Sequence, residues 1–271
     1  MSHEDRVARF YSHGVERYGT FHDNYLNFGL WDPGVADFRG AAEALLRELG
    51  RRVGLDGSSV LLDVACGMGT QDRFFVEEFG CERVCAIDLS PAHIAVAQAR
   101  HALPQIQFGV GNACRLPFPD QAFSHVVAVE GIVHFDTREA FFAEARRMLR
   151  ARGRLGVTDF FLPRPARGPL ERALLRACRR AWHIPEANVC GIEQYARALE
   201  RSGFKDVAIQ AVSERVIPGY YAEQSRPEIR RELRRIRGPV IGRASTAIDR
   251  LMFALYQRGL VGYLIASAVK A

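Results

Sequence analysis

Apolar residues gather in short runs along the chain, and longer segments with helical spacing separate most of these runs. Seven runs have the length and apolar character of buried strands: residues 59–64, 83–88, 106–110, 122–129, 154–159, 207–212 and 262–269. One intervening helix begins at Ser90 and Pro91, where a capping hydroxyl precedes proline at the first helical position. Strands that alternate with helices indicate an α/β protein with a parallel sheet.

Three segments fall outside this alternation. Residues 1–40 are rich in aromatic side chains, whereas residues from about 162–188 and 217–260 are helix-rich. Because open α/β sheets bind ligands at the carboxyl ends of their strands, we expect these segments to form a lid there. The ligand-binding core would comprise residues 41–216, including the insertion at 162–188. Residues 261–271 would add its last strand.

Composition argues against several classes of protein. Hydrophobic residues make up 48% and charged residues 25% of the 271-residue chain, which is usual for a globular protein. No apolar stretch approaches the ~20 residues of a membrane span. The N-terminus lacks the basic and apolar regions of a signal peptide, and the six cysteines have no zinc-ligand spacing. We expect a cytoplasmic protein without a membrane span or a metal site.

Positive charge is concentrated outside the predicted core. Residues 160–183 and 217–258 each carry a net charge of +5, whereas the whole chain carries +6. The arginines between residues 226 and 243 could hold an anionic substrate, although a solvated helix face explains them as well. We find neither a basic stripe interleaved with aromatic residues nor a recognised nucleic-acid module, so we expect no nucleic-acid partner.

The strongest chemical signal follows the first predicted strand, where residues 61–70 read Leu-Leu-Asp-Val-Ala-Cys-Gly-Met-Gly-Thr. Gly67 and Gly69 allow the backbone to turn sharply and to approach a ligand closely. A dinucleotide-binding loop would have a third glycine at position 72. Asp72 would instead place a carboxylate where a pyrophosphate should lie, which argues against a dinucleotide. Asp63 suits a cationic ligand, although it could also stabilise the turn.

A second acid, Asp88, ends the second predicted strand. An acid at this place can accept hydrogen bonds from both hydroxyls of a ribose. Asp88 could instead cap the helix that begins at Pro91, but Ser90 already fills that role. We therefore favour ribose binding.

These motifs, taken in order, resemble the Rossmann-like, or class I, S-adenosylmethionine-dependent methyltransferases. The resemblance spans roughly residues 59–205 and rests on Asp63-Val-Ala-Cys-Gly67-Met-Gly69, on Asp88, and on residues 111–118, 122–127 and 144–155. It implies S-adenosylmethionine as the cofactor. It also implies a Rossmann-like seven-stranded sheet that is mostly parallel, with an antiparallel last strand.

The resemblance also implies how the cofactor would be held. The turn at Ala65, Cys66 and Gly67 would face its methionine part, Asp88 its ribose, and Asn112 with Ala113 its adenine. The complete set of expected cofactor-binding residues is Asp63, Ala65, Cys66, Gly67, Gly69, Asp88, Leu89, Asn112, Ala113 and Glu130. Two positions depart from the family pattern, since Ala65 replaces a glycine and Asn112 replaces an acid.

Three further segments look like the branch of the family that methylates small molecules, including ubiquinone-pathway, tocopherol, sterol, terpenoid and natural-product sugar methyltransferases. They are residues 24–31, with Asn27 in place of the usual histidine, residues 192–204, and the ending 262–270. The resemblance implies a small-molecule acceptor. We expect a monomer or a homodimer.

Candidate catalytic residues follow the fourth and fifth predicted strands. Transfer to a neutral hydroxyl needs a base as well as positioning. Glu130 ends the fourth strand, His134 follows one turn later, and Asp159 ends the fifth. A His134–Asp159 pair would be a base held in one tautomer, and sugar O-methyltransferases of this branch are thought to use such a pair. His134 could instead be a surface or capping histidine, and Asp159 a strand-end cap.

We therefore expect O-methylation of a hydroxylated, natural-product-like metabolite, with two alternatives. In terpenoid and sterol C-methyltransferases an acid at the position of Glu130 stabilises a carbocation or removes its proton. Here aromatic side chains of the first 40 residues could assist through cation–π contacts, namely Tyr11, Tyr18, Phe21, Tyr25, Phe28 and Trp31. The second alternative is a cofactor-binding cyclase or scaffold that transfers no methyl group.

Overall fold

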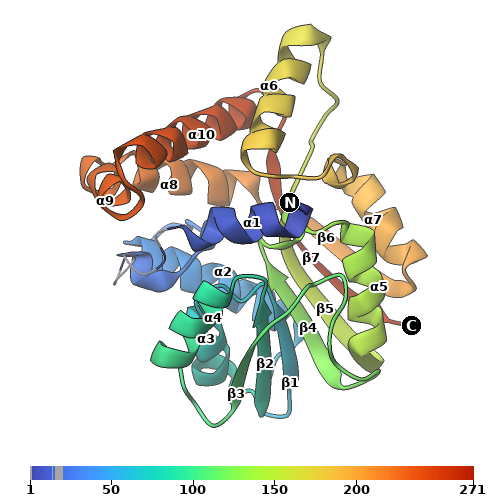
Figure 1. Cartoon of the computed structure of the whole chain (residues 1–271). Coiled ribbons are helices and arrows are strands. Elements are labelled where there is room, and N and C mark those ends of the chain that lie inside the picture. Colours follow the sequence, from blue (N-terminus) through green and yellow to red (C-terminus); the bar gives the residue numbers. More distant parts are fainter. Residues whose placement is uncertain (1, 14, 16–20) are drawn as a thin grey trace.

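The computed structural model of the chain describes residues 2–13, 15 and 21–271 (Figure 1). Its strands are β1 Val60–Val64, β2 Arg83–Asp88, β3 Ile106–Val110, β4 Phe123–Val129, β5 Leu149–Phe161, β6 Phe204–Ala211 and β7 Gly262–Lys270. Its α-helices are α1 His3–Ser12, α2 Phe38–Val53, α3 Thr70–Phe79, α4 Pro91–Arg100, α5 Arg138–Met148, α6 Gly168–Ala181, α7 Ile192–Arg201, α8 Ser213–Ser225, α9 Pro227–Arg237 and α10 Pro239–Gln257.

The strands form one sheet in the order β3-β2-β1-β4-β5-β7-β6. β1 to β5 pair in parallel, and β7 is antiparallel to both of its neighbours, β5 and β6. The predicted α/β class, the Rossmann-like seven-stranded sheet and the antiparallel last strand are thereby confirmed. β5 begins at Leu149 rather than at the predicted Arg154, because Leu149 pairs with Phe123 beyond a register shift in β4.

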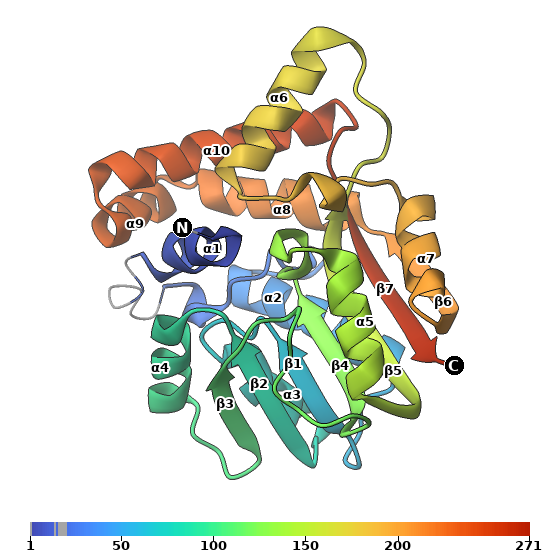
Figure 2. The same cartoon turned by 45° about the vertical axis from the view of Figure 1, so that its right-hand side comes forward.

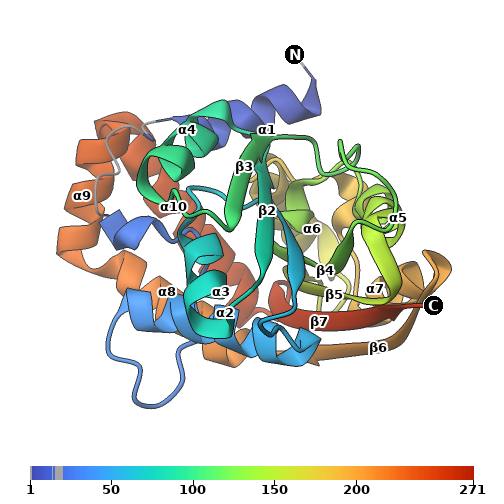
Figure 3. The same cartoon turned by 90° about the horizontal axis from the view of Figure 1, so that it is seen from below.

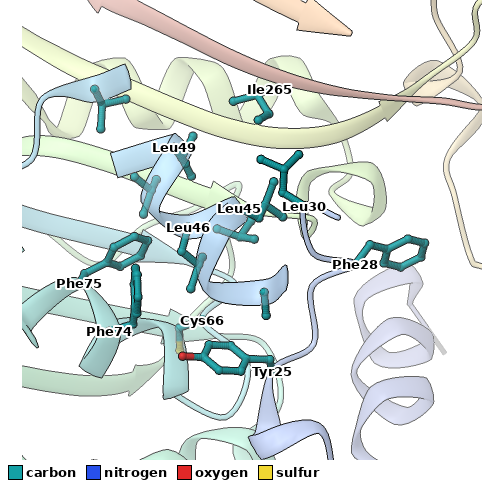
Figure 4. Packing of buried hydrophobic residues seen from close by; sticks show 14 of the residues in the cluster. Tyr25, Phe28, Leu30, Leu45, Leu46, Leu49, Cys66, Phe74, Phe75 and Ile265 are labelled. Carbon is teal, nitrogen blue, oxygen red and sulfur yellow. The ribbon is translucent and has the colours of Figure 1, made fainter. Parts of the chain in front are cut away.

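Helices cover both faces of the sheet, as the view from below shows (Figure 3). α2 and α3 bury leucine and phenylalanine side chains against one face, and α5 and α7 bury theirs against the other. All five residues of β1 are buried, which fits a central strand of a parallel sheet. In Figure 4, Tyr25 of the N-terminal segment lies beside Cys66 at the end of this strand.

α4 packs beside β2 and β3, whereas α1, α6, α8, α9 and α10 lie above the carboxyl ends of the parallel strands (Figures 1 and 2). α1 packs on α4, while α10 packs on α6, α8 and α9. α8 begins at Ser213, close to the end of β6, and continues through Pro218. No helix in the described ranges combines the length and apolarity that a membrane span requires.

Candidate functional site

One cavity of about 610 Å³ lies between the carboxyl edge of the sheet and the helices above it. Its floor is made by residues that follow β1, β2, β3 and β4. Its walls come from residues 3–11, 21–38, 160–189 and 220–261. The cavity therefore joins the glycine turn to the three segments outside the alternating core, and its volume is that of a small-molecule site.

The glycine turn after β1 is tied to the end of β2. The amides of Ala65 and Cys66 both donate to the carbonyl of Ile87, at 2.8 and 3.0 Å. Ala65 has φ +67° and Gly67 has φ +58°, a left-handed conformation that costs an L-residue such as alanine about 1–2 kcal/mol. Ala65 thus keeps the backbone shape that the usual glycine would adopt, at some cost in strain.

The two glycines of the turn have different surroundings. Gly67 lines the cavity, whereas a Cβ on Gly69 would lie 2.8 Å from the Cβ of Ala97 and from the ring of Phe108. Gly69 is therefore required for packing against α4 and β3. Gly69 does not line the cavity, and its contact with the cofactor stays a prediction.

Asp63 lies beneath the turn, fully buried, and does not line the cavity. It accepts a hydrogen bond of 2.6 Å from Gln71 Nε2 and interacts with the equally buried Asp72. Burial raises the pKa of both carboxyl groups, and the neighbouring Asp63 raises that of Asp72 further. Asp63 thus stabilises the turn, which the sequence analysis also allows, and its contact with a cationic ligand stays a prediction.

Asp88 lies at the cavity wall and accepts from three donors. The Gly67 amide lies 3.0 Å from Oδ2, while the Ser90 amide and His93 Nδ1 lie 2.8 and 3.1 Å from Oδ1. A carboxylate offers about four acceptor positions, so one position of Oδ2 remains for a ligand hydroxyl. Ser90 also caps α4 through the His93 amide, as the sequence predicts.

Leu89, Asn112 and Ala113 line the same part of the cavity. The side-chain carbonyl of Asn112 accepts from the amide of Cys114 at 2.8 Å, which fixes the side chain at the head of a turn. Its second lone pair can still accept from a ligand. Ala65, Cys66 and Glu130 also line the cavity, so eight of the ten predicted cofactor-binding residues surround one space.

Glu130 follows β4 and has the left-handed φ of +60°. Its Oε1 accepts from the Phe28 amide at 2.7 Å and from the Tyr263 hydroxyl at 2.6 Å. Burial raises the pKa of Glu130 to about 8, although both hydrogen bonds oppose this shift. A carboxyl group with such a pKa, in contact with the cavity, is suited to accept a proton near neutral pH.

Aromatic side chains surround Glu130. The rings of Phe28 and Tyr220 stack with centroids 3.6 Å apart, and Phe160 lies 5.1 Å from Phe28 and 5.2 Å from Tyr263. Predicted aromatic contributors Tyr11, Phe21, Tyr25 and Phe28 line the cavity, but Trp31 does not. Tyr18 lies outside the described residues. The cavity next to Glu130 is therefore apolar and suits a largely apolar acceptor.

His134 lies in the cavity wall, in a short 3-10 helix after β4. Its Nε2 lies 2.7 Å from the Tyr11 hydroxyl of α1. Burial lowers the pKa of His134 to about 3, so the imidazole is neutral at physiological pH and a weak base.

The predicted His134–Asp159 pair does not form. Asp159 is fully buried and forms an ion pair with Arg138 Nε at 2.6 Å. It also accepts a 3.1 Å hydrogen bond from the Tyr195 hydroxyl. Arg138 belongs to α5 and Tyr195 to α7, so the Asp159 carboxylate points to the face of the sheet that these helices cover. Asp159 is thus committed to the core and cannot orient His134.

The sequence prediction missed several residues of the site. Tyr263 reaches Glu130 from β7, 133 positions along the chain. Asn188 donates to the carbonyls of Val133 and Phe135 at 3.0 and 2.7 Å, and thereby holds the loop that carries His134. Asn188 lies in no recognised motif, and the resemblance over residues 262–270 does not indicate the contact of Tyr263 with Glu130. Each residue acts through a contact between distant segments.

Comparisons with known proteins agree with this arrangement. A family model described as a methyltransferase domain matches residues 61–153. The erythromycin 3''-O-methyltransferase of Saccharopolyspora erythraea is 32% identical over 201 residues, covering 71% of this chain and 66% of that enzyme. The O-methyltransferase rstn1 of Aspergillus nomiae is 31% identical over 161 residues, covering 53% of this chain and 71% of that enzyme. The chain thus spans about two thirds of the erythromycin enzyme.

Among solved structures, the cyclase SpnF matches with a TM-score of 0.79 and 23% identity, over 100% of this chain and 97% of that one. At this identity the match shows the fold alone. The sequence relatives and the family model together show more: the chain belongs to the class I S-adenosylmethionine-dependent methyltransferases. S-adenosylmethionine is its cofactor.

Proposed function

We propose that the protein methylates a hydroxyl oxygen of a small, natural-product-like metabolite. The observation that carries this proposal is the Glu130 carboxyl group, which contacts an aromatic-walled cavity that is continuous with the glycine turn. Its pKa of about 8 suits a base for a neutral hydroxyl. Two relatives that are more than 30% identical carry names of O-methyltransferases, which supports oxygen as the acceptor atom.

The cavity fits the cofactor at one end. There, Ala65, Cys66 and Gly67 would meet its methionine part, and Asp88 would accept from a ribose hydroxyl through the remaining position on Oδ2. Leu89, Asn112 and Ala113 would surround the adenine. Asp63 and Gly69 would act indirectly, by supporting the turn from below.

Glu130 would act on the acceptor at the other end. When bound, S-adenosylmethionine supplies an electrophilic methyl group on a sulfonium, whose sulfur leaves as a neutral thioether. The Glu130 carboxylate takes the proton of the acceptor hydroxyl while the oxygen gains the methyl group. Tyr263 and the Phe28 amide hold this carboxylate in place. His134, neutral and bonded to Tyr11, would contact the acceptor without accepting its proton.

The segments above the sheet would close this reaction space. Cavity walls come from the described residues of the segment 1–40, from the insertion at about 162–188 and from the helices at 217–260. We propose that together they act as a lid that holds the acceptor and excludes water from the methyl group, since exclusion of water favours the displacement.

Two measurements test the proposal in sequence. Isothermal titration calorimetry should show S-adenosylhomocysteine binding in the micromolar range, about −8 kcal/mol. Asp88→Ala should weaken this by about 1–3 kcal/mol, since a buried hydrogen-bonding group is lost. Next, methyl-labelled cofactor would be incubated with hydroxylated metabolites, including 3''-O-demethyl-erythromycin, and products identified by mass spectrometry. Binding of NADH instead of the S-adenosyl compound would contradict the proposal.

C-methylation is the other outcome that this experiment can reveal. The aromatic residues around Glu130 could stabilise a cation, but Phe28 and Tyr220 stack face to face, which covers one face of each ring. If the labelled methyl group were found on a carbon atom of the product, the role of Glu130 would be to remove a proton from a carbocation. Tight cofactor binding without methyl transfer to any acceptor would favour a cyclase or a scaffold.

A further inference from the structure

A buried carboxylate in the lid is not accounted for by the site described above. Asp249 of α10 is 8% exposed and lines the cavity from the lid. Across the described ranges of the chain, no hydrogen bond or ion pair reaches its carboxylate oxygens. Partial burial of a carboxyl group without a partner is unfavourable and raises the pKa of Asp249 to about 7, so its place at a cavity wall points to a ligand group that completes it.

Positive charge lies next to this carboxylate. Arg237 of α9 also lines the cavity, and its charge acts on Asp249. Its Nη1 donates to Ser245 Oγ at 3.4 Å. Its guanidinium also lies over the ring of Phe10, 5.9 Å from the centroid. Arg230 of α9 adds a second positive charge within electrostatic range of Asp249. When Asp249 is ionised, the cavity wall thus presents an acceptor-only carboxylate beside donor-only guanidinium groups.

This combination selects the chemistry of the ligand group. A cationic group would be attracted by Asp249 but repelled by the two arginines. An anionic group would be attracted by the arginines but repelled by Asp249. A hydroxyl group both donates and accepts, so two neighbouring hydroxyls can donate to a carboxylate and accept from a guanidinium. Phe10 supplies an apolar surface next to these groups. A neutral diol on a ring meets all of these conditions.

We propose that Asp249 and Arg237 form a lid subsite that binds a vicinal diol of the acceptor, away from the hydroxyl that is methylated. The subsite rests on the proposed function, because it belongs to the acceptor of that reaction. It identifies the acceptor as a polyhydroxylated, glycoside-like molecule with an apolar portion. Asp249 would be a specificity-determining residue and would take no part in the chemical step.

The test of this subsite measures binding of a probe and requires no methyl transfer. A negative result would therefore reject the subsite without rejecting the proposed O-methylation. Protein saturated with S-adenosylhomocysteine is titrated calorimetrically with two probes. Phenyl β-D-glucopyranoside carries hydroxyls on its ring, and 2-phenoxytetrahydropyran has the same ring without them. The wild-type protein should bind the glucoside at least tenfold more tightly. Asp249→Ala should remove about tenfold or more of its affinity for the glucoside, the effect of losing a charge-assisted hydrogen bond.

Matched variants separate this effect from folding. Asp249→Asn keeps the size of the side chain and one acceptor oxygen, so it should lose less affinity for the glucoside than Asp249→Ala does. Glu232→Gln neutralises an acid of α9 that is paired with Arg235 outside the cavity, and should bind both probes like the wild type. All three variants should bind S-adenosylhomocysteine normally. Equal affinity of the wild type and Asp249→Ala for the glucoside would overturn the proposal, as would a wild-type protein that binds neither probe.

Discussion

Removal of the Tyr263 hydroxyl should move the pH dependence of methyl transfer. This hydroxyl donates to Glu130 Oε1 at 2.6 Å and thereby favours the charged carboxylate. Tyr263→Phe leaves the ring in place. A hydrogen bond to a charged group contributes about 1.5–3 kcal/mol, and one pKa unit corresponds to about 1.4 kcal/mol. The pKa of Glu130, about 8 in the wild type, should therefore rise by about one to two units.

The assay is the pH profile of kcat/KM for an acceptor, at saturating cofactor. A carboxylate base is active when ionised, so activity should rise with pH and level off above about pH 8 in the wild type. Tyr263→Phe should shift this rise to higher pH and reduce activity at pH 7 by about 10–100-fold. Tyr221→Phe, whose ring stacks on Phe253 in the lid, is the control. A rise near pH 6.5, or a profile that Tyr263→Phe leaves in place, would refute the role of Glu130.

Three further variants test other parts of the account. Gly131→Ala would place a Cβ 2.4 Å from that of Ala65, so it should lower the free energy of unfolding, measured in urea, by about 1–3 kcal/mol. Adding Ala65→Gly removes the clash and should restore most of this stability. A double variant that is no more stable than Gly131→Ala would show that the two side chains do not clash. Arg138→Met leaves Asp159 buried without its partner and should cost about 3–5 kcal/mol of stability, whereas unchanged stability would show that the pair is dispensable. His134→Ala should keep the rise near pH 8 and lose less than the 10²–10⁴-fold expected for a base, and loss of the rise would restore His134 as the base.

The sequence predicts the sheet well because its strands are buried and bounded by turn residues. β2 and β3 have the predicted bounds, and β1 differs by one residue. The glycine turn and Asp88 are predictable for a similar reason, since both lie within a few residues of a strand end. The parallel sheet then brings the ends of β1 and β2 together, so the glycine turn and Asp88 lie side by side.

Contacts between distant segments could not be predicted in this way. Asp159 and His134 follow neighbouring strands, which suggested a pair, but the direction of each side chain depends on the face that it occupies. Arg138 and Tyr195 draw Asp159 toward α5 and α7. Asp63 likewise belongs to a motif that the sequence shows, yet its carboxylate lies below the turn. Asp249 stands in a segment without any motif, and its burial depends on how α9 packs on α10.

The most direct test of the account is the position of a labelled methyl group and its dependence on Glu130. The protein would be incubated with cofactor carrying a ¹³C-methyl group and with an acceptor identified among the hydroxylated metabolites by mass spectrometry. The product would then be examined by NMR. The account predicts a methyl carbon bonded to oxygen, formed by the wild type and slowed by about 10²–10⁴-fold in Glu130→Gln. S-adenosylhomocysteine should bind this variant within about twofold of the wild type. A methyl group on carbon, or full activity of Glu130→Gln, would contradict the account.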